Sequence, residues 1–238
     1  MPPSASGDTT VLFIHQNFPA QFVHLSAALA ERPNTRIVAV RSTGQKLHPR
    51  IRSLHYNPLA GLPDHTLPPC HPWVADAQIK ALRAEAVLRV LTPERAAGLS
   101  PDLIIGHTGW GELLAIRQLF PAAPILGYQE FFYHLHGADI NYDPEFTTNH
   151  PAEPGRIAFK TSTQLLDSTT IDWGLAPTWW QWSLFPPSMR ARMSVIHDGI
   201  DCNLIKPDLD ATLRIKRAGL TLRAGDEVVT FINRNLEP

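Results

Sequence analysis

The sequence has only two cysteines among its 238 residues, Cys70 and Cys202, and they lie far apart. Two distant cysteines cannot form a disulfide framework or a cysteine-rich zinc module, and they fit a reducing compartment. No apolar run approaches the roughly 20 residues that span a bilayer, and residues 1–10 lack the charged and then apolar pattern of a secretory signal. We therefore expect a cytoplasmic protein whose contact with a membrane, if any, is peripheral and at the inner face.

An excess of charge of one sign is also missing. The chain carries 21 Lys and Arg against 22 Asp and Glu, for a formal net charge of −1. Proteins that bind nucleic acid through its phosphates usually carry a strongly basic patch, and the sequence contains no such cluster. We therefore expect no nucleic-acid partner. The length leaves room for one large domain, or for one domain and part of another.

The amino-terminal part alternates short apolar runs with a segment of helical periodicity. Residues 10–15 and 36–41 are runs typical of central parallel strands, and residues 21–31 between them place apolar side chains at helical spacing. A strand, a helix and a strand joined by such short links imply a right-handed crossover. The pattern predicts an α/β fold with a Rossmann-like parallel sheet and helices on both faces.

The rest of the chain is divided by its prolines and glycines. The patterns predict a mostly irregular excursion at 42–72, helices at 74–97 (divided by Pro93), 113–119, 156–171 and 178–185, and strands at 125–128, 173–177 and 194–197. They further predict a helical or linker stretch at 209–220 and a strand at 228–232. A strand that close to the chain end indicates the start of another domain, so we expect a first domain at 1–207, a linker at 208–227 and a truncated second domain at 228–238.

The stretch from Asp102 to Glu112 carries the strongest functional signal. Residues 103–105 are aliphatic, as in a buried strand, and the run breaks off into His107 and a glycine-spaced polar turn. Ligands gather at the carboxyl ends of strands in a parallel sheet, so His107 lies where chemistry is usually found. The alternative is that His107 only caps the strand and bonds to a neighbouring loop.

Two further groups of polar residues follow predicted strands. His15 and Asn17 come directly after the first strand and could face a cleft. The alternative for His15 is a histidine that only makes its hydrogen bonds at the end of the strand. The long loop at 129–150 carries Glu130, Tyr133, His134 and Asp139, which could bind hydroxyl groups of a substrate; alternatively, the loop is packed by its own aromatic side chains. The histidines lack the paired spacing of metal ligands, so no metal site is expected.

Several stretches taken together carry a family resemblance. They are FIHQNFPAQF at 13–22, PDLIIGHTGWGE at 101–112, GYQEFFY at 127–133, GAD at 137–139, DWG at 172–174, SVIHDGID at 194–201 and TFINRNLEP at 230–238. In this order, and over nearly the whole chain, they resemble the family-four glycosyltransferases. Enzymes of that family have the GT-B fold, in which two Rossmann-like domains face each other across a cleft.

The resemblance implies that residues up to about Pro207 form the amino-terminal, acceptor-side domain and that Val228 begins the donor-binding domain. It implies transfer of a sugar from a nucleotide-sugar donor, with retention of configuration and without a metal or another cofactor. The acceptor could be a glycan, a lipid-linked molecule or a small molecule. Most of the donor-binding domain, with its sugar-binding glutamate pair, is absent, so we expect this chain alone to be inactive.

The resemblance also assigns roles to residues. By motif match, His107 is the histidine close to the transferred sugar, and Arg234 is the arginine that contacts the donor phosphates. Asn17 and Ala20 lie in the first βα loop, close to those phosphates. The family usually carries glycine in that loop, and the Cβ of Ala20 would restrict φ and crowd a ligand. On the acceptor side the expected residues are His15, Glu130, Tyr133, His134 and Asp139.

Two other functions are compatible with the sequence. One is a non-catalytic Rossmann-like module, or remnant, that binds a ligand and transfers nothing. The other is a nucleotide-sugar epimerase of similar two-domain build. A downstream series of helices and strands with two spaced glutamates would favour the transferase, whereas an immediate stop would favour the remnant.

Overall fold

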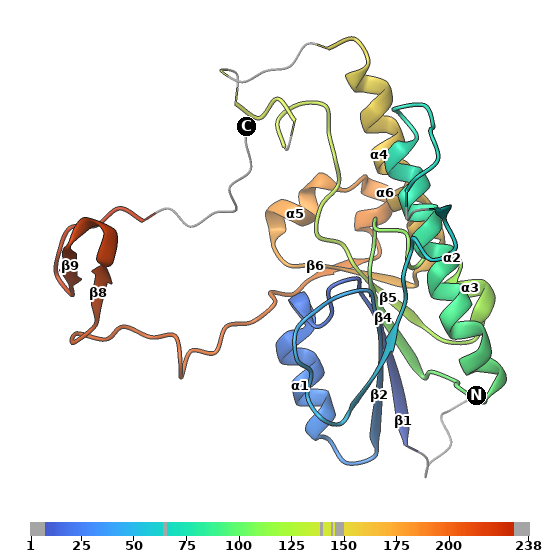
Figure 1. The fold of residues 1–238 in the computed structure, drawn as a ribbon, viewed down its shortest axis with the longest axis horizontal. Coiled ribbons are helices and arrows are strands. Elements are labelled where there is room, and N and C mark those ends of the chain that lie inside the picture. Colours follow the sequence, from blue (N-terminus) through green and yellow to red (C-terminus); the bar gives the residue numbers. More distant parts are fainter. Residues whose placement is uncertain (1–7, 64–65, 139, 144, 146–149, 231–238) are drawn as a thin grey trace. The chain divides into compact units, whose positions relative to one another are not determined.

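The structure is a computed structural model that describes residues 8–63, 66–138, 140–143, 145 and 150–230. The chain divides into two compact units, Met1–Asp198 and Gly199–Pro238. The first unit holds a parallel sheet with helices packed against it, and the second holds a small hairpin (Figure 1). The predicted division of the chain into two functional domains stays a prediction, because its second domain rests mainly on residues 231–238.

All strands of the described sheet in the first unit run parallel. They are β1 (Thr9–Ile14), β2 (Thr35–Arg41), β3 (Ile51–His55), β4 (Leu103–His107), β5 (Ile125–Tyr128), β6 (Trp173–Ala176) and β7 (Met193–Val195). Their order is β3-β2-β1-β4-β5-β6-β7. The chain first moves outward from β1 to β3 and then returns to place β4 on the other side of β1. The switch in direction, where ligands bind in such sheets, therefore lies between β1 and β4.

Helices cover both faces of this sheet. They are η1 (Ala20–Phe22), α1 (Val23–Glu31), α2 (Ala75–Ala96), α3 (Ile116–Leu119), α4 (Glu153–Thr170), α5 (Trp179–Leu184) and α6 (Pro187–Arg190). Val11 and Phe13 of β1 belong to one core cluster, which η1 and α1 complete, whereas Leu12 and Ile14 belong to another, which α2 and α3 complete. Alternate residues of a strand point to opposite faces. The predicted Rossmann-like sheet with helices on both faces is confirmed.

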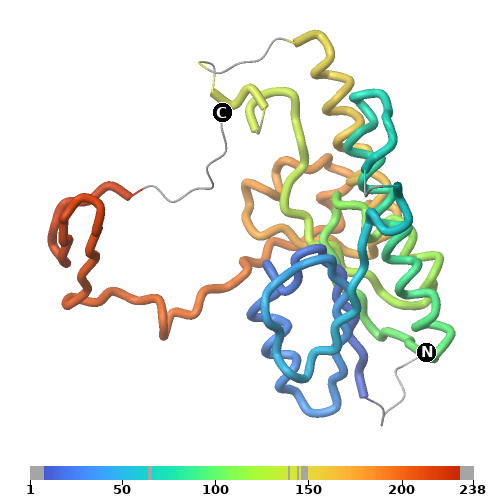
Figure 2. Tube along the Cα trace, viewed as in Figure 1, coloured from blue at the N-terminus to red at the C-terminus, as the bar shows by residue number. Residues whose placement is uncertain are grey.

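Helix α4 buries its polar side instead of its apolar side. The buried polar residues are Thr161, Thr163, Gln164, Asp167 and Thr170, whereas Phe159, Leu165 and Leu166 are exposed. Buried polar groups normally have hydrogen-bond partners. Here the partners include backbone groups of two loops at the carboxyl edge of the sheet, and Figure 2 shows the chain directly after β5, at 129–138, leading away from that edge.

Strand β3 corrects the prediction that residues 42–72 are mostly irregular. It pairs with β2 along one side and has no strand beyond it among the described residues. Only Ile51 of its five residues is buried. A half-exposed edge strand lacks the continuous apolar run of a central strand. The sequence pattern at 51–55 therefore does not indicate a strand.

Helix α2 corrects the prediction that Pro93 divides it, because the helix runs through Pro93 to Ala96. A proline removes one backbone donor and usually disturbs the turn before it. Val87 and Leu91, in the two turns before Pro93, are fully buried against the sheet and hold the helix in place. The helix predicted at 113–119 is also shorter than expected, since only Ile116–Leu119 is helical.

The second unit contains an antiparallel hairpin of β8 (Thr212–Ile215) and β9 (Leu220–Arg223). A short 3-10 turn, η4 (Lys216–Ala218), and Gly219 at φ 61° connect them. The helical alternative predicted for 209–220 is therefore wrong. The left-handed backbone at Gly219 reverses the chain, and the backbone groups of β8 and β9 pair with each other instead of within a helix. Residues 228–230 are irregular, and the remainder of the strand predicted at 228–232 lies outside the described residues.

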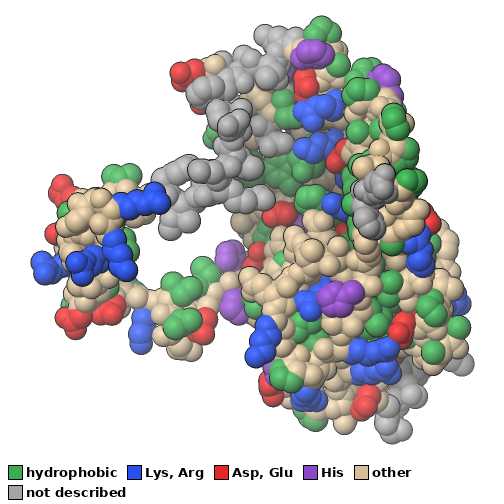
Figure 3. Space-filling view, in the orientation of Figure 1, with side chains coloured by type: hydrophobic (Ala, Val, Ile, Leu, Met, Phe, Trp, Pro, Cys, Tyr) green, Lys and Arg blue, Asp and Glu red, His purple; other side chains and the backbone are tan. Residues whose placement is uncertain are grey.

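The surface carries both signs of charge. On the face of the first unit shown in Figure 3, Lys and Arg side chains are interspersed with Asp and Glu. None of the helices in the described ranges combines the length and the apolar composition that crossing a bilayer requires.

Candidate functional site

Two buried histidines meet at the switch point of the sheet. His15 directly follows β1, and His107 is the last residue of β4, the strand that pairs with β1. Each side chain is 5% exposed, and their ring centroids lie 5.3 Å apart. The parallel order of β1 and β4 thus brings together two residues that are far apart in the sequence. Both were predicted to lie at this edge.

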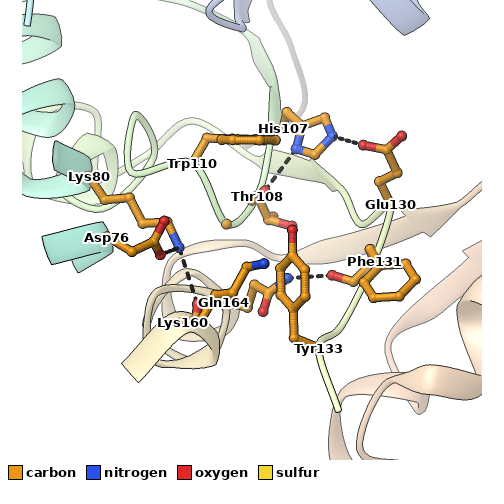
Figure 4. Close-up of a pocket in the computed structure, with 11 residues that line it drawn as sticks. Asp76, Lys80, His107, Thr108, Trp110, Glu130, Phe131, Tyr133, Lys160 and Gln164 are labelled. Carbon is orange, nitrogen blue, oxygen red and sulfur yellow. Dashed lines mark hydrogen bonds and ion pairs between the residues drawn. The ribbon is translucent and has the colours of Figure 1, made fainter. Parts of the chain in front are cut away.

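His107 uses both ring nitrogens. Nδ1 lies 2.8 Å from the carbonyl oxygen of Thr108, and Nε2 lies 3.0 Å from Oε2 of Glu130 (Figure 4). A carbonyl only accepts, so Nδ1 carries a hydrogen and donates it. Glu130 accepts from Nε2, and this hydrogen bond is the main reason that the pKa of Glu130 lies below its ordinary value. Both ring nitrogens of His107 therefore face oxygen acceptors, one in its own loop and one in the loop after β5.

His15 has a different environment. Its Nδ1 accepts a hydrogen bond from the backbone N–H of Asn17 at 2.9 Å, which requires an unprotonated Nδ1. Burial lowers the pKa of His15 from 6.5 to about 3, and the neighbouring His107 lowers it further, against smaller opposing effects of Glu130 and Gln21. His15 is therefore a neutral ring.

The end of β5 supports this pair. The ring of Tyr128 lies 5.2 Å from that of His107, and the Tyr128 hydroxyl donates to the carboxylate of Asp198 at 2.8 Å. Burial, followed by the hydrogen bond to Asp198, raises the pKa of the Tyr128 hydroxyl. Tyr128 thus stays protonated and ties the sheet edge to the segment after β7.

Helix α4 holds the two loops that carry the functional side chains. Asp167 accepts a hydrogen bond from the backbone N–H of Gly109 at 2.6 Å, in the loop after β4. Gln164, one turn earlier, donates through Nε2 to the carbonyl oxygen of Phe131, in the loop after β5. Residues three apart on a helix lie on one face. One turn of α4 therefore fixes the position of His107 relative to Glu130.

Two buried carboxylates lie behind the loop after β4. Burial raises the pKa of Asp167 from 3.8 to about 7, and the Gly109 amide only partly opposes this. Glu112, which is 2% exposed, accepts from the hydroxyl of Tyr56 at 2.6 Å, and burial raises its pKa as well. The side of the loop that faces the interior therefore holds two buried carboxyl groups, with Lys80 and Arg83 close enough to lower their pKa values in part.

A small pocket opens beside His107. It measures about 210 Å³, and its walls come from α2, the loops after β4 and β5, and α4. The lining residues are Asp76, Lys80, His107, Thr108, Gly109, Trp110, Glu130, Phe131, Tyr133, Lys160 and Gln164. Figure 4 shows the Trp110 ring edge-on at one side of this space, with Asp76 and Lys80 on one flank and Tyr133 on the other. The structure thus brings together three predicted residues, His107, Glu130 and Tyr133.

The predicted donor-side residues Asn17 and Ala20 line a second pocket, of about 440 Å³, together with Thr43 and Gly44. Ala20 has φ 39°, in the left-handed region that favours glycine. The backbone here adopts the conformation that a glycine would adopt freely, although the residue is alanine. The donor-binding role of both residues stays a prediction.

The remaining predicted residues lie elsewhere. His134 packs on Phe132 and bonds through Nε2 to the carbonyl oxygen of Leu184 at 2.7 Å, and it is not part of the lining beside His107. Its acceptor-binding role stays a prediction. Asp139 and Arg234 lie outside the described residues. In the described part of the chain, no group of three or more His, Cys, Asp or Glu side chains is arranged to hold a metal ion.

Sequence reasoning missed four residues that shape the site: Lys80, Trp110, Gln164 and Asp167. Lys80 is 3% exposed, pairs with Asp76 at 2.5 Å and donates to the carbonyl oxygen of Lys160. The helices that carry Lys80, Gln164 and Asp167 were predicted, but their buried faces were not. The exposed Leu165 and Leu166 make α4 misleading, because an apolar stripe normally marks the inward face.

Comparisons with known proteins bear on this geometry. The chain is similar in structure to Os79 from O. sativa, solved with UDP and deoxynivalenol-3-glucoside, at 12% identity and a TM-score of 0.50; the match covers 84% of this chain and 55% of that chain. It is also similar to a UDP-glucosyltransferase from Polygonum tinctorium (10% identity, TM-score 0.45, 85% and 55% covered). A third match is the UDP-GlcNAc 2-epimerase from Neisseria meningitidis (14% identity, TM-score 0.42, 79% and 45% covered).

Identities this low show the fold alone, and the chain spans about half the length of these proteins. Curated protein sequences contain no significant match to the chain. The model of one family, described as the Glycosyl transferase family 4 group, matches residues 33–205. This match includes β2 to β7 with His107, Glu130 and the helix that holds their loops, and it extends over most of the chain. The chain therefore belongs to the Glycosyl transferase family 4 group.

Proposed function

We propose that this chain is the acceptor-side domain of a glycosyltransferase that transfers a sugar from a nucleotide-sugar donor to a hydroxyl group, with retention of configuration. The observation that carries the proposal is the position of His107. It lies buried at the switch point of a Rossmann-like sheet, bonded to Glu130 and beside a pocket. Membership of the glycosyl transferase family 4 group supports this reaction class.

In this reaction the bond between the anomeric carbon and the diphosphate oxygen breaks, and a new bond forms between that carbon and the acceptor oxygen. The acceptor hydroxyl loses its proton, which leaves with the diphosphate. Negative charge grows on the leaving group, so His107, as a positioned hydrogen-bonding ring close to the transferred sugar, stabilises the transition state. We assign stabilisation of the phosphates to Arg234 and to backbone amides of the first βα loop, without a metal.

The two pockets divide the substrates between them in this proposal. Asn17 and Ala20 line the pocket after β1 and contact the donor, whereas Glu130 and Tyr133 line the pocket beside His107 and contact the acceptor. His15, buried and neutral, packs against His107 and holds its ring in place.

The other wall of the cleft belongs, in this proposal, to a carboxyl-terminal donor-binding domain, with the boundary near residue 207. Catalysis across a cleft needs both walls, because the donor must be held against the acceptor while water is excluded. The 238-residue chain alone is then expected to bind no nucleotide-sugar at micromolar concentration and to turn none over.

The experiment compares this chain with a longer protein in which a donor-binding domain follows it. Both are incubated with a panel of nucleotide-sugars and sugar acceptors, and the released nucleotide diphosphate and the glycoside are measured. Transfer by the longer protein only, with retained configuration at the anomeric carbon, supports the proposal. An epimerised nucleotide-sugar in place of a glycoside would identify an epimerase, and donor binding without any product would identify a binding module. Turnover by the 238-residue chain alone would show that the division of roles is wrong.

A further inference from the structure

The pocket beside His107 is too small to enclose an extended ligand. Its volume of about 210 Å³ lies below the roughly 300–1,000 Å³ of pockets that enclose drug-sized molecules. Its walls are fixed from several sides, since Gln164 bonds to the loop after β5 and Asp167 bonds to the loop after β4. The space therefore suits one ring of a substrate.

The charges around the pocket balance each other. Asp76 and Glu130 supply two carboxylates, and Lys80 and Lys160 supply two ammonium groups. Asp76 and Lys80 are already paired at 2.5 Å, and Glu130 already accepts from His107. An anionic ligand would approach these carboxylates without an excess of cations to offset the repulsion. The lining therefore favours an uncharged ligand.

The pocket combines flat aromatic surfaces with hydrogen-bonding groups. Trp110, Phe131 and Tyr133 line it, and the ammonium group of Lys160 lies 3.6 Å from the centre of the Tyr133 ring. Figure 4 shows the Trp110 ring edge-on, so that one of its faces borders the space between Lys80 and Tyr133. An apolar ring would displace water from the polar groups of the pocket and offer them no hydrogen bonds in return, which is unfavourable. A sugar ring presents C–H groups to an aromatic face and hydroxyls at its edge.

We propose that this pocket is the acceptor subsite for one uncharged pyranose ring, whose reacting hydroxyl faces Glu130 and His107. The role of this ring as an acceptor rests on the proposed function. The binding of an uncharged pyranose in this pocket does not. We therefore expect this pocket to bind the uncharged terminal sugar of a glycan in preference to a phosphorylated or acidic sugar, or to a small apolar molecule.

The test is a titration of the 238-residue chain followed by NMR, with methyl glucoside, methyl galactoside and methyl mannoside as uncharged probes. Sodium glucuronate and glucose 6-phosphate are anionic probes with the same ring, and phenol is an apolar ring. At least one methyl glycoside is expected to bind with a millimolar Kd, and the anionic probes about fivefold more weakly or worse. If none of the methyl glycosides binds, or if an anionic probe or phenol binds more tightly, the proposal is wrong.

Variants locate the binding. Trp110→Ala should weaken the best glycoside by about tenfold, because it removes an aromatic face. Trp179→Ala is the matched control, since Trp179 is 71% exposed on α5 and lies outside the pocket lining. If Trp110→Ala does not fold, Tyr133→Leu tests the opposite wall with the same expectation. An unchanged Kd in a folded Trp110→Ala or Tyr133→Leu variant would overturn the proposal.

Charge is tested separately by Glu130→Gln, which keeps the shape of the side chain and removes one negative charge from the lining. The ratio of the glucuronate Kd to the methyl glucoside Kd should fall by about fivefold. A ratio that does not change would contradict the charge argument. Glycoside binding by a protein that transfers no sugar would disprove only the proposed function, and a transferase that ignores these glycosides would disprove only this inference.

Discussion

His15 and His107 occupy equivalent positions and have opposite electrostatic environments. Each lies at the carboxyl end of one of two paired strands, and each is 5% exposed. His15 accepts from the backbone of its own loop, through the N–H of Asn17, and stays neutral. His107 faces a carboxylate from a different loop, Glu130 after β5. Equal burial and equivalent position therefore leave the two histidines with different hydrogen-bond partners.

The two rings have different hydrogen-bond partners, and their loops are held by different elements. The Glu130 carboxylate reaches His107 because α4 holds the loops after β4 and β5. The loop after β1 is held mainly by contacts to Arg41, Ser42 and Thr43, which follow or end β2. The comparison places reactivity at His107 and structural support at His15, and the following changes test this division.

The largest effect is expected from His107→Ala in a protein with both domains. Loss of a positioned polar group from the reacting centre should lower kcat by about 10²-fold or more. The matched control is His24→Ala, since His24 is exposed on α1. Nucleotide diphosphate release measures turnover, and the melting temperature checks the fold. Unchanged turnover with an unchanged melting temperature would remove His107 from catalysis.

Asp167→Asn should change how stability depends on pH. Burial raises the pKa of Asp167 from 3.8 to about 7, so the folded chain holds a proton that the unfolded chain releases as the pH rises from about 4 to 7. Wild-type stability therefore falls over this range because of Asp167, whereas the asparagine variant does not ionise.

The free energy of unfolding of Asp167→Asn relative to wild type should thus increase between pH 5 and pH 8, on the order of 2 kcal/mol. Urea unfolding at the two pH values measures this difference. Asp102→Asn is the control, because Asp102 accepts from the backbone of Thr10 at the opposite edge of the sheet. A difference that is the same at both pH values would show that Asp167 is ionised in the folded chain throughout.

Gln164→Ala should loosen the loop that carries Glu130. Removal of the hydrogen bond to Phe131 leaves a partly buried carbonyl without this partner, at a cost of about 1–2 kcal/mol, and should shift the ring resonances of His107. Thr161→Val is the matched control, because Thr161 lies on the same buried face but bonds only within α4. Equal shifts of the His107 resonances in both variants would contradict the role of Gln164.

The smallest effect is expected at the first loop, from Ala20→Gly. Relief of the left-handed backbone at φ 39° should raise the free energy of unfolding by about 0.5–1 kcal/mol. Ala27→Gly is the control with the opposite sign, because glycine inside the exposed part of α1 should lower it by about 0.8–1 kcal/mol. The same sign for both variants, measured by urea unfolding, would show that Ala20 is not strained.

Much of the site could be read from local sequence because strand ends are local features. The apolar run before His107 is short and ends abruptly, which is typical of a strand buried on both faces. The run before His15 gives the same signal. Edge strand β3 and the continuous helix through Pro93 could not be read in this way, because their stability comes from β2 and from the core rather than from their own residues.

The sequence by itself determined the order of the central strands and long helices of the first unit, the glycosyltransferase family resemblance, and the presence of His15, His107 and Glu130 at strand ends. Only the tertiary structure decided which of these side chains meet. The spacing of His107 and Glu130 depends on Gln164 and Asp167, and these lie on a helix whose exposed leucines conceal its buried face. Periodicity reports which residues share a face of a helix, but which face turns inward depends on the hydrogen-bonding groups that the rest of the fold brings against it.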